Sequence, residues 1–248
     1  MADLWRSQVL EAFTASAGRY DASAQLQRAV AWRLAQMCRR QRVSSGLWLD
    51  LGSGTGRLAD ALQQLHPQQS VLRVDGSAAM LDRHRDGSAT LLHDLNADLP
   101  TWPTAPVLMG SNFVLHWLHD PPSRLRHWFD QLASGGWLVV AVPVQGCFQQ
   151  WQEAATRAGT PCTALPFPSI DDLLEAVPAE AVRWKQLHRF TRRGHHPLQL
   201  LRPMISTGAN ITPADSLGPA AWRRVFRSWP DPDRPALSWT ILTLMLQR

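Results

Sequence analysis

The chain has 248 residues, 45% of them hydrophobic and 18% charged, a balance typical of a folded globular protein and not of a disordered one. Its net charge of +5 favours an acidic partner, but the basic residues are dispersed and not interleaved with aromatic ones, which argues against nucleic-acid binding. Cys38, Cys147 and Cys162 lack the spacing of a disulfide framework or a metal site. No apolar run approaches the roughly 18 residues of a membrane span, and the first thirty residues contain three acids, so we expect a cytoplasmic protein without a membrane partner.

The first 145 residues alternate between predicted helices and strands. Apolar residues at helical spacing predict a helix over residues 25–40, within an N-terminal helical segment over residues 1–45. The strands are predicted over residues 47–51, 71–74, 90–93, 107–110 and 137–142, and the helices between them over 57–65, 78–84 and 123–132. Such alternation indicates an α/β fold with a doubly wound, mostly parallel sheet covered on both faces.

After residue 145 the pattern changes to helical stretches interrupted by prolines. We expect residues 145–215 to form a helical cap over the carboxyl edge of the sheet, where ligands bind in open α/β folds. In and after this segment the sequence predicts a strand over 182–190, helices over 198–205 and 213–227, and a closing antiparallel strand over 237–246. A length of 248 residues suits one α/β domain with an inserted cap, so residues 1–248 are predicted to form a single domain.

The segment Asp50-Leu51-Gly52-Ser53-Gly54-Thr55-Gly56, called the glycine loop below, follows the first predicted strand. Its alternating glycines favour a tight turn in which a ligand lies against bare backbone at a helix N-terminus. A dinucleotide fold prefers GxGxxG, whose third glycine would fall at Arg57, and Asp50 would repel pyrophosphate but suits a cationic ammonium group. The loop therefore favours S-adenosylmethionine as the cofactor, with Asp50, Gly52, Ser53, Gly54 and Gly56 as its binding residues.

Two further acidic residues follow predicted strands. Asp75 ends the second strand, 19 residues after Gly56 (75 minus 56), where a carboxylate can bind the two ribose hydroxyls of an adenosyl group; a helix N-cap is the alternative. Asp94 follows the third strand and is predicted to accept a hydrogen bond from the adenine amino group, with Leu95 packed on the ring; a solvated loop aspartate is the alternative. Gly76 and Met80 are placed in the same cofactor site.

Asn112 ends the fourth predicted strand, next to the point where the strand order reverses. It is expected either to line the cofactor cleft or to cap a helix. His116 and Trp117 follow shortly after it, at the same edge of the predicted sheet. A lone histidine there is expected to be a packed surface residue and not a base.

Together these residues resemble the class I S-adenosylmethionine methyltransferases, which have a Rossmann-like fold, and within them the malonyl-acyl-carrier-protein O-methyltransferases of biotin synthesis. The narrower resemblance rests on short motifs spread over most of the chain. They are Ala12-Phe13, Tyr20-Asp21, Ala24-Gln25-Leu26-Gln27-Arg28, Ser111-Asn112 with Trp117, Val144-Gln145-Gly146, and Leu201-Arg202 followed by Gly208-Ala209. The chain departs from the family after Arg202, where Pro203-Met204-Ile205-Ser206 stands in place of a basic residue that is frequent in the family.

The resemblance implies methyl transfer to the free carboxylate of a malonyl group held on an acyl carrier protein, giving the ester that primes pimeloyl synthesis for biotin. Because a malonyl carboxylate is already ionised at neutral pH, this transfer requires no general base. Tyr20 lies in the N-terminal segment that folds over the cofactor in this family, so we assign it to cofactor binding and to catalysis. Arg202 is predicted to hold the substrate carboxylate, since a guanidinium group binds carboxylates by forked hydrogen bonds.

Malonyl-acyl-carrier protein, which is acidic, is accordingly the predicted partner. A candidate landing surface for it is formed by basic residues of the C-terminal half, namely Arg189, Arg192, Arg193, Arg223, Arg224 and Arg227. Two alternatives stay open: a methyltransferase of a small free carboxylic acid or other metabolite, and a non-catalytic adenosyl-binding protein.

Overall fold

The computed structural model describes the backbone of residues 2–248 and the side chains from residue 7 onward. A seven-stranded sheet with the order β3-β2-β1-β4-β5-β7-β6 forms its centre. The strands are β1 (Trp48–Leu51), β2 (Val71–Asp75), β3 (Thr90–Leu92), β4 (Leu108–Asn112), β5 (Trp137–Pro143), β6 (Val182–Arg193) and β7 (Ala236–Gln247). Strands β1 to β5 are parallel, and β7 runs antiparallel to both of its neighbours. The predicted α/β sheet with an antiparallel closing strand is confirmed.

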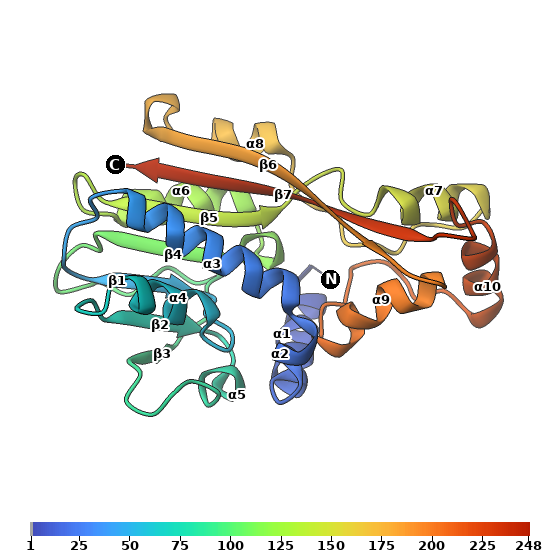
Figure 1. Ribbon diagram of the computed structural model, residues 1–248, viewed down its shortest axis with the longest axis horizontal. Helices are drawn as coiled ribbons and strands as arrows, with labels where there is room; N and C mark the ends of the chain where they lie inside the picture. The colour runs from blue at the N-terminus through green and yellow to red at the C-terminus, as the bar shows by residue number, and fades with distance from the viewer. Residues whose placement is uncertain (1) are drawn as a thin grey trace.

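Helices cover both faces of this sheet (Figure 1). Helices α3 (Gln25–Arg40) and α4 (Arg57–Leu65) pack on one face, and α6 (Pro121–Gln131) and α8 (Ile170–Glu175) pack on the other. The alternation of side chains along a strand explains how one apolar run supplies both cores. In β5 the side chains that face α3 and α4 are Trp137, Val139 and Ala141, and those that face α6 and α8 are Leu138, Val140 and Val142.

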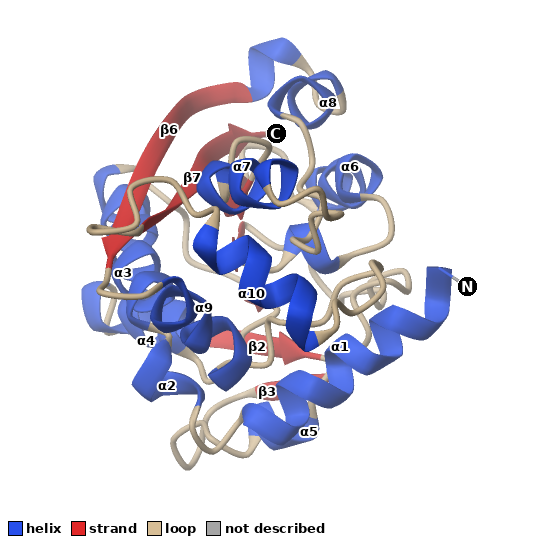
Figure 2. Cartoon of the chain, turned by 90° about the vertical axis from the view of Figure 1, so that its right-hand side faces the viewer, coloured by secondary structure: helices blue, strands red, loops and turns tan. Residues whose placement is uncertain are grey.

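Strands β6 and β7 are longer than the others and extend beyond the parallel part of the sheet, as Figure 1 shows. Around their far ends, α7 (Gln149–Arg157), α9 (Pro197–Ser206) and α10 (Pro219–Arg227) form what we call the cap, with its own apolar core that includes Trp151, Leu200 and Val225. Figure 2 looks onto this end of the molecule, where the cap helices lie together with α1 (Ala2–Ser16). Residues 145–215, predicted to be the cap, thus also contain β6, a strand of the sheet.

The predicted starts and ends of several elements shift by a few residues. Helix α5 (Ala78–Leu81) is shorter than the predicted 78–84, and β6 continues to Arg193. The helix predicted over residues 213–227 begins later, because residues 213–218 lie before α10. Proline suits the first turn of any helix, and Pro219 occupies that position behind the N-cap Gly218. Within the described part of the chain, no helix is both long and apolar enough to cross a membrane.

Candidate functional site

The glycine loop joins β1 to α4 at the carboxyl edge of the sheet, and all three of its glycines have positive φ. A β-carbon on Gly52 would lie 2.2 Å from Cγ2 of Val114, so no larger residue fits there. At Gly54, in contrast, nothing lies within 4 Å of the position that a side chain would take. The bare backbone at Gly54 therefore borders open space, as expected for a backbone against which a nucleoside cofactor is predicted to lie.

Asp50 is buried beneath the loop, with 1% of its surface exposed, and its Oδ2 accepts a hydrogen bond of 2.9 Å from the backbone N–H of Ala59. Burial raises the pKa of the Asp50 carboxyl to about 7, although the Ala59 N–H and the positive charge of Arg73 oppose the shift. Next to it, the hydroxyl of Ser53 is buried and has no partner among the described residues. A buried polar atom without a partner is costly, which fits a group that meets a ligand.

Asp75 ends β2 and reaches directly to the glycine loop. Its Oδ2 accepts from the backbone N–H of Gly54 at 2.7 Å and its Oδ1 from that of Ser77 at 2.9 Å. Burial raises the pKa of Asp75, and these hydrogen bonds act against that shift. The N-cap of α5 is Ser77, whose hydroxyl accepts from Met80, so capping does not explain Asp75. The predicted loop and ribose-binding residues therefore lie together, with Gly76 next to Asp75.

The other predicted cofactor residues make contacts of their own. The exposed Asp94 accepts from the backbone N–H of Asn96 at 2.9 Å, while Leu95 is buried in the core. Asn112 donates to the backbone carbonyl of Gln27 at 3.0 Å and so connects β4 to α3. Its side-chain oxygen is buried and has no partner in the described part of the molecule. The roles of Asp94, Leu95 and Asn112 toward the cofactor stay predictions.

Two residues that support the glycine loop were not found from the sequence. Arg73 is buried in β2 and binds Asp60 at 2.8 Å and Gln63 at 2.7 Å. A ring nitrogen of His84, Nε2, lies 2.7 Å from the carbonyl oxygen of Gly54. A proton on Nε2 allows His84 to donate to Gly54, and burial lowers its pKa, which favours the neutral ring. The signal for Arg73 was an arginine within an otherwise apolar strand, whose charge must be paired when the strand is buried.

The two N-terminal helices close over this site. In α2 (Tyr20–Ser23), Asp21 accepts hydrogen bonds from the Thr55 hydroxyl at 2.7 Å and from the Arg57 Nε at 3.1 Å. In α1, the hydroxyl of Thr14 lies 2.8 Å from that of Ser77. These contacts bring Tyr20 close to Asp75; burial, together with the negative charges of Asp75 and Asp21, raises the Tyr20 pKa.

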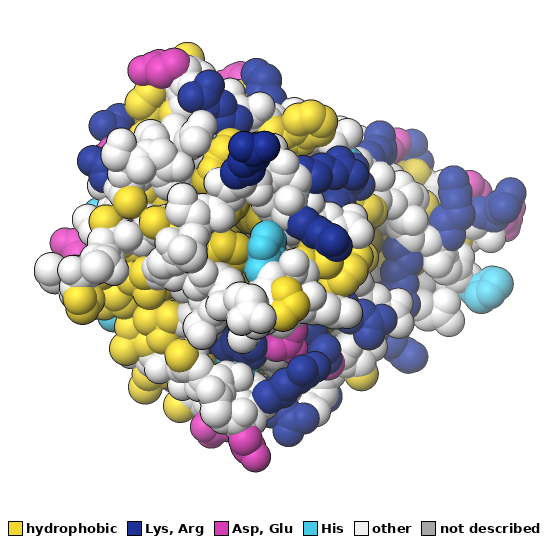
Figure 3. All heavy atoms as spheres, turned by 60° about the vertical axis from the view of Figure 1, so that its left-hand side comes forward, with side chains coloured by type: hydrophobic (Ala, Val, Ile, Leu, Met, Phe, Trp, Pro, Cys, Tyr) yellow, Lys and Arg dark blue, Asp and Glu magenta, His cyan; other side chains and the backbone are white. Residues whose placement is uncertain are grey.

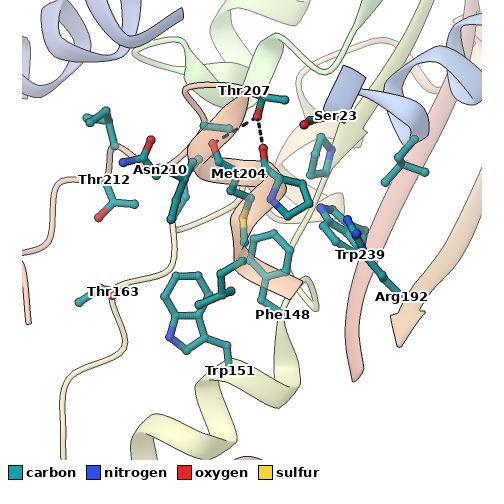
Figure 4. Close-up of a pocket in the computed structure, with 18 of the residues that line it drawn as sticks. Ser23, Phe148, Trp151, Thr163, Arg192, Met204, Thr207, Asn210, Thr212 and Trp239 are labelled. Atoms are coloured by element: carbon teal, nitrogen blue, oxygen red, sulfur yellow. Dashed lines mark hydrogen bonds between the residues drawn. The ribbon is translucent and has the colours of Figure 1, made fainter. Parts of the chain in front are cut away.

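A cavity of about 1250 Å³ lies between these helices, the segment that follows β4 (residues 113–117) and the cap. It is lined mainly by apolar and aromatic side chains, among them Phe13, Phe113, Trp117, Phe148, Trp151, Phe167, Phe190, Trp222, Phe226 and Trp239. Figure 4 shows how Phe148, Trp151 and Met204 of the cap region surround this space, with Trp239 and Arg192 at one side. Tyr20, which was predicted to bind the cofactor, also lines it, whereas no residue of the glycine loop does so.

The charged residues of the cavity are all cationic. Arg192 and Arg223 line it, and no aspartate or glutamate does so among the residues whose side chains are described. Arg202 lies on α9, is exposed, and is not among the lining residues. Of the two predicted catalytic residues, the structure therefore brings Tyr20 to the cavity and leaves Arg202 outside it.

His116 is buried in the wall of this cavity, in the 3-10 turn η1 (Leu115–Trp117). Its ring lies among aromatic neighbours, with centroid distances of 4.9 Å to Trp117 and 5.6 Å to Phe167. Burial lowers its pKa to about 3, and its buried Nδ1 has no hydrogen-bond partner in the described structure. His116 is thus neutral at physiological pH, as expected for a packed residue, but it is buried and not on the surface.

Comparison with known proteins agrees with this geometry. A family model described as a methyltransferase domain matches residues 19–232. A malonyl-[acyl-carrier protein] O-methyltransferase of Halorhodospira halophila is 31% identical over 92% of this chain and 82% of its own length. A trans-aconitate 2-methyltransferase of Deinococcus radiodurans is 38% identical, but over only 38% of this chain and 37% of its own.

Solved structures share the fold at low sequence identity. A putative methyltransferase of Bacillus halodurans superposes with a TM-score of 0.58 at 12% identity, covering 86% of this chain and 97% of that one. A possible histamine N-methyltransferase of Thermotoga maritima gives a TM-score of 0.52 at 14% identity, covering 95% and 98%. The predicted resemblance, enzyme class and cofactor, S-adenosylmethionine, are confirmed, and the chain belongs to the methyltransferase domain family.

Proposed function

We propose that this enzyme transfers the methyl group of S-adenosylmethionine to the carboxylate of a malonyl group carried by acyl carrier protein. The observation that carries the proposal is the cavity beside Tyr20, whose described lining contains two guanidinium groups and no carboxylate. Such a cavity attracts an anionic acceptor. The malonyl-[acyl-carrier protein] O-methyltransferase of Halorhodospira halophila, which aligns with 92% of this chain, supports the malonyl group as the acceptor.

The neutral groups in the cavity fit an acceptor that arrives ionised. S-adenosylmethionine supplies an electrophilic methyl group on a sulfonium. A lone pair of the carboxylate oxygen forms the new bond to the methyl carbon while the carbon–sulfur bond breaks and its electron pair stays on sulfur, so no proton moves. His116, with its pKa lowered to about 3, and Tyr20, with a raised pKa, are poor bases at neutral pH but can donate hydrogen bonds to an anion.

Three arginines are candidates for holding the carboxylate. All three are exposed; Arg192 and Arg223 line the cavity, and Arg202, predicted from the sequence, does not. A guanidinium that leaves water to bind a carboxylate in a cavity forms charge-assisted, forked hydrogen bonds. The proposal therefore favours Arg192 or Arg223 for this role and treats Arg202 as the test case.

The proposed landing surface for the carrier protein uses the same two elements. Arg189, Arg192 and Arg193 lie on β6, and Arg223, Arg224 and Arg227 lie on α10. Figure 3 shows one face of the molecule, on which Lys and Arg side chains occur in several places separated by hydrophobic and uncharged surface. Arginines that are spread over two elements suit steering of an acidic protein more than a tight, localised charge contact.

The experiment is methyl transfer from labelled S-adenosylmethionine to malonyl-acyl-carrier protein, followed by mass analysis of the product. Arg192→Ala and Arg223→Ala are expected to raise KM or abolish transfer while calorimetry shows unchanged cofactor binding. Arg202→Ala tests the residue predicted from the sequence, and Arg183→Ala is the matched control, because it removes an exposed arginine of β6 that does not line the cavity. Full activity of both cavity variants would remove these arginines from the proposal, and cofactor binding without transfer to any carboxylate would favour a non-catalytic adenosyl-binding protein.

A small free carboxylic acid is the second candidate acceptor. The partial match to a trans-aconitate 2-methyltransferase favours it, since that protein's name describes a methyltransferase of a free acid. The same cationic cavity suits such an acid equally well. Methylation of free acids at rates above that of malonyl-acyl-carrier protein would replace the leading proposal with this one.

A further inference from the structure

The backbone of Gly54 is held from two sides by side chains outside the glycine loop. Its N–H donates to Oδ2 of Asp75 at 2.7 Å, and its carbonyl oxygen lies 2.7 Å from Nε2 of His84. Gly54 has φ of +51°, and nothing lies within 4 Å of the position that a side chain would take. Because glycine has wide conformational freedom and no packing holds it on that side, these two hydrogen bonds restrict how its backbone is oriented.

His84 reaches the loop from the segment that follows α5. It lies three residues after the last residue of that helix, and its backbone N–H donates to the carbonyl of Leu81 at 3.1 Å. The position of its ring is therefore set by α5 and not by the glycine loop. The ring joins two segments that are 30 residues apart in the sequence.

Both ring nitrogens of His84 face a partner, and the partners determine where the proton is. Nδ1 lies 3.4 Å from Nη1 of Arg73. A guanidinium group has only donors, so Nδ1 accepts and the proton of the neutral ring is on Nε2, facing the carbonyl of Gly54. Burial lowers the pKa of His84, and the positive charge of Arg73 acts in the same direction, which favours this neutral ring.

Arg73 is itself fixed by the helix that follows the glycine loop. It is 3% exposed, and its Nη2 donates to Asp60 at 2.8 Å and to Gln63 at 2.7 Å, both on α4. Moving a buried charge away from its partners is costly. A chain of contacts thus runs from α4 through Arg73 and His84 to the carbonyl of Gly54.

We propose that His84 is a positioning residue for the cofactor, which orients Gly54 so that S-adenosylmethionine meets a preformed loop. Without this hydrogen bond the backbone at Gly54 takes more conformations in the free protein, and the cofactor must order it on binding. That ordering lowers affinity although no contact to the cofactor is removed. The inference goes beyond the proposed acceptor, because it concerns the cofactor alone.

The test compares two substitutions of the same residue. His84→Leu keeps a side chain of similar size but removes both nitrogens. It is expected to raise the Kd of S-adenosylmethionine and of its demethylated product by about three- to tenfold, the range for one hydrogen bond. His84→Gln supplies one donor and one acceptor from its amide and is expected to keep both Kd values within about twofold of the wild type.

Calorimetric titration measures these Kd values without any methyl acceptor, so the result stands whichever acceptor is methylated. His195→Leu is the matched control, because it makes the same substitution at an exposed histidine between β6 and α9 that does not line the cavity. Its Kd is expected to equal that of the wild type. Urea unfolding of each variant shows how far its stability has changed.

A second measurement uses the wild-type protein and does not depend on the folding of His84→Leu. Nitrogen NMR of the histidine rings, with the His84 signals assigned by their absence in His84→Gln, is expected to show a neutral ring with its proton on Nε2. A proton on Nδ1 alone would overturn the proposal. So would an unchanged Kd for His84→Leu, or equal weakening of cofactor binding by His84→Leu and His84→Gln.

Discussion

Each glycine of the glycine loop is required for a different local reason. Gly52 faces Val114, Gly56 faces the guanidinium of Arg73 with 2.7 Å to a β-carbon placed there, and Gly54 borders open space. All three also have positive φ, which disfavours any residue with a β-carbon. A side chain added at Gly52 or Gly56 is therefore expected to lower the stability of the protein, whereas one added at Gly54 would enter the space predicted for the ligand.

Replacing Gly52 with alanine is expected to destabilise the protein. The added β-carbon would lie 2.2 Å from Val114 Cγ2 on a backbone with φ of +71°, and overpacking plus left-handed strain lowers the free energy of unfolding by about 2 to 4 kcal/mol. Urea unfolding measures the change. The second substitution Val114→Ala in the same chain is expected to restore part of the loss.

Gly87→Ala is the control for the cost of the left-handed backbone alone, since Gly87 has φ of +79° and nothing lies within 4 Å of its β-carbon position. We expect a loss of about 1 to 2 kcal/mol there, the usual cost of left-handed backbone. An equal loss at Gly52 and Gly87, or no recovery with Val114→Ala, would contradict the clash.

The buried carboxyl of Asp50 predicts a pH-dependent stability. Its pKa of about 7 in the folded state lies above the ordinary value of 3.8, so between these values the folded state binds more protons than the unfolded state. The contribution of Asp50 to the free energy of unfolding therefore falls as pH rises from about 4 to about 7, by at most about 1.4 kcal/mol per pH unit. Asp50→Asn removes this contribution and is expected to be more stable relative to the wild type at pH 8 than at pH 4.

Urea unfolding of the wild type and of Asp50→Asn between pH 4 and pH 8 measures the difference between their free energies of unfolding. The titration of Asp75 and of other groups contributes to both proteins and cancels in this difference. The exposed Asp82, at the end of α5, gives the matched control Asp82→Asn, whose stability should follow the wild-type curve. Parallel curves for Asp50→Asn and the wild type would show that Asp50 does not titrate in this range.

At this level the sequence predicted the loop well and its surroundings poorly. The turn and the acids at the two strand ends, Asp50 and Asp75, could be located because a strand end, a glycine spacing and an acid are local features, and their roles toward the cofactor stay predictions. Arg192 and Arg223 were named only as surface residues, and their place in the cavity depends on how β6 and α10 meet in space. His84 was read as part of a helix, and its contact with Gly54 joins residues 30 positions apart.

Helix α2 depends on tertiary contacts for its position. It has only four residues, far fewer than a helix needs to be stable in isolation. Hydrogen bonds from Arg57 and Thr55 outweigh the effect of burial and lower the pKa of Asp21, so the carboxylate is ionised when it holds α2 against the glycine loop. Tyr20 is carried to the cavity by the same helix.

Asp21→Ala is expected to weaken cofactor binding by about two- to fivefold, the range for a partly exposed ion pair. The pair is partly exposed, with 39% of each side chain accessible, so a larger effect is not expected. Calorimetric titration with S-adenosylmethionine measures the change, and Asp82→Ala removes an exposed carboxylate that does not contact α2, for comparison. An unchanged Kd for Asp21→Ala would mean that α2 does not control access to the loop.

Among the elements, those with one strong period were predicted closely and those with competing signals were not. Helices α3 and α4 begin and end at the predicted residues because an apolar stripe spans their whole length. Two prolines six residues apart, Pro213 and Pro219, gave two possible starts for α10, and the cap core around Trp229 and Val225 selects the second. The cap was expected from the change in pattern, but the sheet strand inside it continues to Arg193 because pairing with β7 extends that far.

Several cations of the molecule lie where an acidic partner would approach the cavity. Arg192 and Arg223 line the cavity, and Arg193 and Arg227 lie exposed on the same elements. The N-terminal edges of the parallel strands, next to the last turn of α3, lie at the opposite end. A protein substrate that docks on β6 and α10 would therefore depend on charge in a way that a small acid does not.

This dependence distinguishes the two candidate acceptors. With malonyl-acyl-carrier protein, kcat/KM is expected to fall by about tenfold between roughly 0.05 and 0.3 M salt, because screening shortens the reach of exposed charges. With malonyl-pantetheine the fall should be less than about twofold, since steering contributes little to a small substrate. Arg193→Glu and Arg227→Glu are expected to lower only the carrier-protein rate, while Arg40→Glu at the far end of α3 changes neither. Equal salt dependence for the two substrates would favour the free acid, because the arginines of β6 and α10 would then take no part in recognising a protein.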